Sequence, residues 1–91
     1  MPSKYFRIFK KADAQLNKLY KELMATLEPD RKNSLKRTQQ LWLKYKDAQC
    51  EYESDEFKGG SLAGLVFSSC QERITQQRNA DFVELLKTSQ Q

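Results

Sequence analysis

Histidine is absent from this chain of 91 residues, which also contains only three glycines, two prolines, two cysteines and one tryptophan. Without histidine the commonest general base is missing, and two cysteines alone leave a Cys/His zinc site two ligands short. No apolar run approaches the roughly 18 residues of a membrane-spanning helix. We therefore expect a non-enzyme that has no catalytic, metal-binding or cofactor-binding residues and no membrane span.

Large apolar residues are also few. Leucine, isoleucine, valine and phenylalanine make up 20 of the 91 residues, or about 22%. Charged chains with less than about 20% of these residues are usually disordered, and a domain of this size buries only about 60% of its unfolded surface. Residues 1–91 are therefore expected to form a single domain that uses almost all of its large apolar side chains.

Helix-breaking residues divide the chain at two places, Glu28-Pro29-Asp30 and Gly59-Gly60-Ser61. Apolar residues recur every three or four positions in the three segments between them, as on one face of a helix. This spacing predicts helices over residues 5–27, 30–57 and 61–87, with Ser61 as the cap of the third. Because both connections are short, the prediction is an all-α, antiparallel three-helix bundle.

The second segment has an aromatic and semi-polar stripe rather than an aliphatic one. Its wide face suggests a helix in the middle of the bundle, with a neighbour on each side. The stripe consists of Leu35, Thr38, Trp42, Tyr45, Gln49 and Tyr52.

The two cysteines test the pairing of the second and third helices. If Cys50 faces Cys70, Trp42 meets Arg78 in a cation–π contact. The same register brings Asp47 to Arg73, which predicts a salt bridge. Folding the first two helices about position 29 also brings Leu16 to Trp42, which predicts Trp42 as the centre of the core.

The residues alone leave the state of the cysteines open. A disulfide in an oxidising compartment and two reduced thiols in the cytosol are both compatible with two cysteines 20 positions apart. A bond would stabilise so small a domain by about 3 kcal/mol through the entropy of the unfolded chain.

Charge is unevenly distributed: residues 1–49 have a net charge of +7 and residues 50–91 a net charge of −3. The basic half could bind nucleic acid or another anionic surface. Acidic residues interrupt this basic series, so we rank nucleic-acid binding below binding to a protein. The basic residues concerned are Lys10, Lys11, Lys18, Lys21, Arg31, Lys32, Lys36 and Arg37.

Several stretches together resemble the LprI-type lysozyme-inhibitor-like domain. Residues 12–23 are similar to its opening helix, and residues 40–50 match more specifically. The matching positions are the set Trp42-x4-Asp47-x2-Cys50, then Gly59-Gly60-Ser61, Cys70 and Thr75-x2-Arg78.

The resemblance implies a periplasmic or secreted bacterial binding module in which Cys50 and Cys70 form a disulfide between the second and third helices. It implies a protein partner, with a lysozyme-like muramidase as the candidate, although few members inhibit lysozyme. A structural or partner-binding domain with an unknown ligand is the alternative. The motif residues Trp42, Asp47 and Arg78, together with Arg73, are expected to make structural contacts.

A muramidase inhibitor has to cover a cleft that contains two carboxylates. A small polar loop with a basic side chain suits that task. The candidate binding residues are therefore Lys58, Gly59, Gly60 and Ser61.

The first residues give no secretory signal, because the apolar stretch Tyr5–Phe9 is short and is followed by Lys10-Lys11. A cytosolic chain and a mature domain behind an added methionine would both begin in this way. The resemblance favours the second, so we expect a signal peptide to be missing from this chain.

Overall fold

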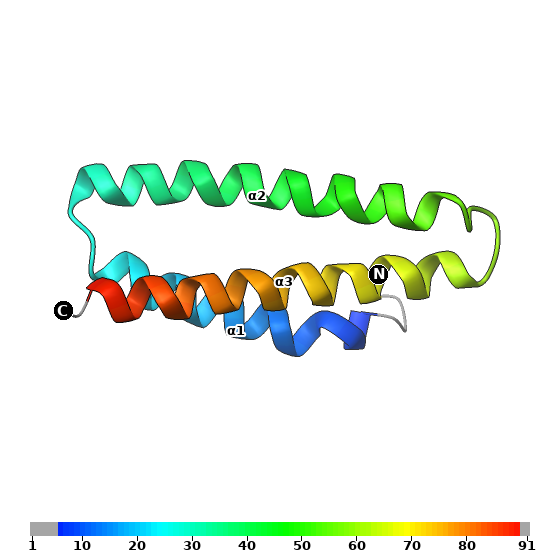
Figure 1. Ribbon diagram of the computed structural model, residues 1–91, viewed down its shortest axis with the longest axis horizontal. Helices are drawn as coiled ribbons and strands as arrows, with labels where there is room; N and C mark the ends of the chain where they lie inside the picture. The colour runs from blue at the N-terminus through cyan, green and yellow to red at the C-terminus, as the bar shows by residue number, and fades with distance from the viewer. Residues whose placement is uncertain (1–5, 90–91) are drawn as a thin grey trace.

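Three α-helices make up most of residues 6–89, the part of the chain that the structure describes: α1 (Phe6–Ala25), α2 (Pro29–Asp55) and α3 (Leu62–Ser89). In this computed structural model α1 and α3 run in the same direction and α2 runs in the opposite direction (Figure 1). The prediction of an all-α, antiparallel three-helix bundle is confirmed. The helix ends lie within two residues of the predicted ones, and the predicted start at residue 5 lies outside the described residues.

The two turns follow from the helix-breaking residues. Pro29 occupies the first turn of α2, where its missing N–H has no helical partner to lose, and the Lys32 N–H donates to the Glu28 carbonyl at 2.9 Å. At the other turn Gly59 adopts a φ of 85°, a left-handed conformation that favours glycine. At each of these turns the chain reverses direction, so α2 runs opposite to α1 and α3 runs opposite to α2.

The core consists of two clusters along the bundle. One joins Leu16, Leu19 and Leu23 of α1 to Phe82 of α3, whose side chain is fully buried. The other consists of the two cysteines and Ile74. The α1 stripe therefore packs on α3 as its spacing of three and four residues requires.

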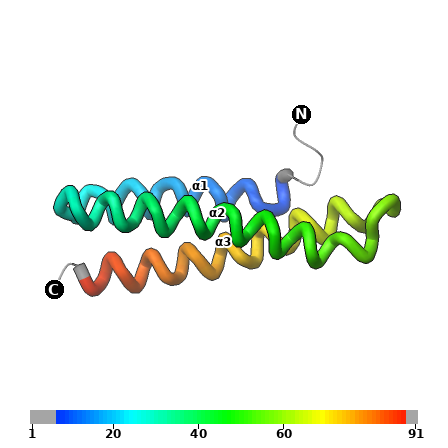
Figure 2. The backbone as a smooth tube through the Cα atoms, turned by 90° about the horizontal axis from the view of Figure 1, so that it is seen from above, coloured from blue at the N-terminus to red at the C-terminus, as the bar shows by residue number. Residues whose placement is uncertain are grey.

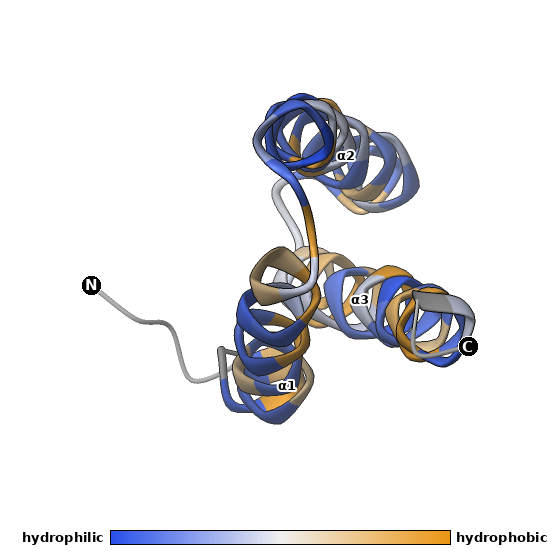
Figure 3. Ribbon diagram, turned by 90° about the vertical axis from the view of Figure 1, so that its left-hand side faces the viewer, coloured by the Kyte–Doolittle hydropathy of each residue, from blue (hydrophilic) through white to orange (hydrophobic). Residues whose placement is uncertain are grey.

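The middle helix of the bundle is α3, not α2 as the sequence suggested. α1 and α2 each pack against α3 but have little contact with each other. Figure 3 shows α1 and α3 side by side, with α2 farther from α1. α2 therefore needs only a narrow contact face, and Tyr45 and Tyr52 of its predicted stripe are exposed.

The bundle is elongated, with principal dimensions of 48 × 23 × 21 Å. Seen from above, α2 passes obliquely over its neighbours and meets the start of α3 at the loop end (Figure 2). The loop between α2 and α3 and the link between α1 and α2 therefore lie at opposite ends of the molecule (Figure 1).

Candidate functional site

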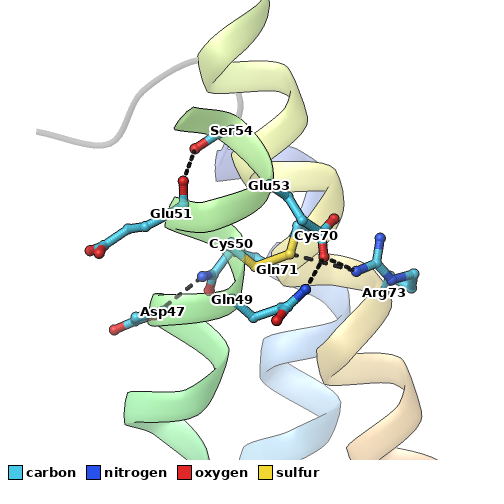
Figure 4. Close-up of a disulfide and its surroundings, with 9 residues drawn as sticks. All are labelled: Asp47, Gln49, Cys50, Glu51, Glu53, Ser54, Cys70, Gln71 and Arg73. Atoms are coloured by element: carbon cyan, nitrogen blue, oxygen red, sulfur yellow. Dashed lines mark hydrogen bonds and ion pairs between the residues drawn. A yellow bond between two sulfur atoms is a disulfide. The ribbon is translucent and has the colours of Figure 1, made fainter. Parts of the chain in front are cut away.

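A disulfide bond between Cys50 and Cys70 joins α2 to α3, and their Cα atoms lie 5.5 Å apart. Both side chains are buried, and they pack with Ile74. Figure 4 shows the bond crossing directly from one helix to the other. The cysteine pairing that the resemblance implied is thus confirmed. We call residues 51–69, the segment between the two cysteines, the hairpin tip.

Polar side chains link the same two helices on either side of the disulfide (Figure 4). The Gln71 amide donates to Asp47 Oδ1 at 3.2 Å, and Arg73 Nη2 lies 2.6 Å from Glu53 Oε2. The predicted salt bridge between Asp47 and Arg73 is therefore wrong. Side chains on a helix lean towards its N-terminus, so the long Arg73 side chain reaches towards the hairpin tip and meets Glu53 instead.

The Glu53 carboxylate has two donors. The hydrogen bond from Arg73 is the main cause that lowers the pKa of Glu53 from its ordinary value of 4.5, and a second hydrogen bond, from Gln49 Nε2 at 2.8 Å, lowers it further. The contact with Glu53 likewise raises the pKa of Arg73. Both partners are therefore charged at neutral pH and hold the base of the hairpin tip together.

Trp42 lies half-buried between the two core clusters and contacts two cations. Lys46 Nζ is 5.1 Å and Arg78 Cζ is 5.7 Å from the centre of its ring. The register that pairs Cys50 with Cys70 predicts this contact of Trp42 with Arg78. The expectation that Trp42 forms the centre of the core is wrong in that Trp42 is only partly buried, whereas Phe82 in one of the two clusters is fully buried.

The tip of the hairpin presents backbone and charge to solvent. The Gly60 N–H donates to the Phe57 carbonyl at 2.9 Å and closes the turn. The Lys58 side chain is 85% exposed, and its Nζ lies 3.9 Å from Asp55 Oδ1. A side chain added at Gly59 would meet nothing within 4 Å. The four predicted binding residues are consecutive in this loop: Lys58, Gly59, Gly60 and Ser61.

The hairpin tip extends beyond the described part of α1. Asn79 of α3 donates to the Ala12 carbonyl of α1 at 3.0 Å, across 67 residues. Because the two helices are parallel, this offset places Phe6, the first described residue of α1, level with Arg73. Figure 1 shows α2 and α3 continuing as a pair past the start of α1. The disulfide therefore lies at the base of a projecting two-helix element.

The charges of this element differ from those of the rest of the molecule. The hairpin tip has four acidic residues and one basic residue, Lys58. All the other basic side chains of the described residues lie outside the hairpin tip, most of them on α1 and α2. The four acidic residues are Glu51, Glu53, Asp55 and Glu56.

Comparison with known sequences identifies the family. Residues 4–82 match the family described as lysozyme inhibitor LprI. The chain belongs to this family. It is also 30% identical to an uncharacterized protein of Rhizobium meliloti (strain 1021) over 95 residues, which cover 90% of this chain and 68% of the relative. No solved structure matches the chain.

Membership of LprI, an inhibitor family by its description, is consistent with a non-enzyme that binds a protein partner. LprI proteins are usually periplasmic or secreted. Within residues 6–89, no helix is long and apolar enough to cross a membrane. In the same part of the chain, no three His, Cys, Asp or Glu side chains are grouped so that they could hold a metal ion.

Several polar residues that connect the helices were not predicted from the sequence. Gln39 accepts a hydrogen bond from Arg78 Nε at 3.1 Å, and Gln71 and Asn79 bond to α2 and α1. The sequence does contain a pattern that indicates their position, because residues on one face of a helix recur every three or four positions. The residues that follow this spacing are Gln71, Thr75, Asn79 and Phe82. These positions therefore share the inner face of α3 although three of them are polar.

Proposed function

We propose that this LprI protein is a non-catalytic binding module that inhibits a lysozyme-like muramidase by placing its hairpin tip over the substrate cleft. The observation that carries the proposal is the projection of a disulfide-linked loop beyond the rest of the bundle. An element that has to enter or cover a cleft must be free of its own domain on several sides.

Rigidity favours this role for the hairpin tip. An inhibitor loses affinity when a loop has to be ordered upon binding, and rigidifying the loop beforehand reduces that loss. The disulfide and the pair formed by Arg73 and Glu53 hold the two helices together at the base of the tip. The loop is therefore presented on two helices that are already fixed to each other.

The chemistry of the loop also suits a muramidase cleft, where two carboxylates flank the scissile bond. The ammonium group of Lys58 can approach such carboxylates, since its exposed contact with Asp55 contributes little. The open space around Gly59 allows the backbone itself to come close to a partner. The acidic residues behind the loop would attract a basic enzyme over a longer range.

The disulfide supports the compartment that the proposal requires. Disulfides form and persist in oxidising environments and are rare in the cytosol. A buried bond between Cys50 and Cys70 thus favours the periplasm or the extracellular space, where muramidases meet cell-wall substrate.

Inhibition of a purified basic muramidase, measured as the rate of lysis of cell-wall substrate, tests the proposal. The wild-type chain should reduce the rate, and Lys58→Glu should raise the inhibition constant about tenfold, because attraction to the cleft carboxylates becomes repulsion. Lys36→Glu is the matched control. It makes the same charge change on an exposed side chain of α2 outside the hairpin tip and should inhibit like the wild type.

Two results would contradict the proposal. The first is a wild-type chain that leaves the lysis rate unchanged at high micromolar concentration. The second is equal inhibition by Lys58→Glu and Lys36→Glu, which would place the contact elsewhere on the molecule.

A further inference from the structure

A groove of about 410 Å³ opens at the end of the molecule opposite the hairpin tip, between the first turns of α2 and the last turns of α1 and α3. Its volume lies in the range of sites for small ligands. Four of its nine lining residues are leucines, and its only charged lining residues among residues 6–89 are two arginines. The residues concerned are Leu23, Leu27, Leu35, Leu85, Arg31 and Arg78.

Arg78 is the less usual of the two cations because it is half-buried without a counter-ion. Its Nε donates to the neutral amide of Gln39, and its guanidinium lies over the rings of Trp42 and Phe82. No carboxylate in the described part of the chain forms an ion pair with it. Asp81, whose charge acts on it, is exposed and makes no such contact.

Burial lowers the pKa of Arg78, but an arginine side chain in a protein does not lose its proton. The groove therefore contains a permanent positive charge that is partly removed from water. Such a charge is costly unless a partner neutralises it. Arg78 still has guanidinium donors beyond the Nε–H that Gln39 uses, and a planar anion such as a carboxylate can accept them in pairs.

We propose that this groove binds a single-chain fatty-acid carboxylate, with the carboxylate at Arg78 and Arg31 and the alkyl chain along the four leucines. The apolar wall accounts for the alkyl chain, because its contact with the leucines removes apolar surface from water. The two cations, with no acidic residue in the lining, account for the sign of the headgroup. This site is separate from the hairpin tip and does not depend on muramidase binding.

Titration of the whole oxidised chain with dodecanoate, below its critical micelle concentration, tests the proposal. Trp42 is the single tryptophan and lies beside Arg78, so its fluorescence reports on the groove, and calorimetry gives the stoichiometry. We expect saturable one-to-one binding of dodecanoate. Dodecyltrimethylammonium should bind at least about tenfold more weakly because its headgroup is repelled. Acetate, which has the headgroup without the chain, should not bind measurably.

Two variants locate the ligand without disturbing the core. Leu85 is 47% exposed and Arg31 is exposed, so Leu85→Glu and Arg31→Gln should fold normally. Each should weaken dodecanoate binding about tenfold, since one adds a repelling charge and the other removes a charge-assisted contact. Leu41→Glu is the matched control, because Leu41 is 56% exposed on α2 and does not line the groove. It should bind like the wild type.

Absence of saturable binding would overturn the proposal, and so would equal affinity for the two amphiphiles of opposite charge. Variants of the groove that bind as tightly as Leu41→Glu would show that the ligand sits elsewhere. The test is independent of inhibition, because Lys58→Glu should retain full affinity for dodecanoate.

Discussion

Removal of the disulfide should weaken one end of the molecule far more than the rest. We consider the double variant in which both cysteines are replaced, Cys50→Ala with Cys70→Ala. Alanine is preferred to serine because a serine hydroxyl group would be unpaired at either of these two fully buried positions. The bond closes a loop between residues 20 positions apart. Loss of that constraint on the unfolded chain corresponds to about 3 kcal/mol of the free energy of unfolding. The removed sulfur atoms add a further cavity cost at the same place.

The position of the bond determines where this loss is felt. The described part of α1 begins level with Arg73, so α2 and α3 continue past it as a pair through the hairpin tip. Besides the disulfide the hairpin tip depends on Ile74 and Phe67, while Leu62 and Leu65 are largely exposed. We therefore expect the amides of the hairpin tip to exchange nearly freely in the variant, whereas α1 and the second half of α3 keep most of their protection.

Urea unfolding and amide hydrogen exchange provide the measurements. For a domain of this size, 3 kcal/mol corresponds to a fall in Tm of about 12–24 °C. A loss below about 1 kcal/mol would refute the entropic estimate. Equal loss of protection along the whole chain would refute the assignment of the bond as the main support of the tip. The wild-type chain in reductant should behave like the double variant.

Two further predictions concern stability. Phe82→Ala should lower the free energy of unfolding by about 3–5 kcal/mol, because it leaves a cavity at the fully buried site where α1 packs on α3. A loss below about 1 kcal/mol in urea titrations would contradict a central packing role for Phe82. Glu53 has a lowered pKa in the folded state, and its ion pair with Arg73 therefore stabilises the chain fully at pH values above the ordinary pKa of 4.5. This contribution is lost as the pH falls through the lowered pKa of the folded state. The stability difference between the wild type and Glu53→Gln should therefore be present at neutral pH and absent in strong acid, and a difference that persists in acid would contradict the assignment.

The positions of the turns could be predicted from the sequence because proline and paired glycines act locally. Pro29 and Gly59 interrupt helical hydrogen bonding wherever the neighbouring helices lie. The choice of the middle helix could not be predicted in this way. A stripe shows which face of a helix is apolar, but it does not show which partner covers it, and Tyr45 and Tyr52 remain exposed although they follow the helical spacing.

The residues of the candidate site could be predicted from the sequence more readily than the shape of the site. The residue types of the cysteines and Lys58, together with the resemblance to LprI, were sufficient to select them. The projection of the hairpin tip depends on the offset between α1 and α3, which is set by packing between residues 67 positions apart. The partner of Arg73 depends on the direction and reach of one long side chain, so a register estimated from residue numbers alone selected the wrong carboxylate.

The offset between α1 and the hairpin also has a consequence for the order of folding. In the oxidised unfolded chain, the Cys50–Cys70 bond keeps the α2 and α3 segments close together, so their pairing requires little further loop closure. α1 has to find α3 across a much longer stretch of chain. We therefore expect the transition state to contain the paired hairpin near Ile74, while the contacts of Leu16 form later. Docking of α1, the first of the three helices in chain order, is then the last step by which the bundle assembles.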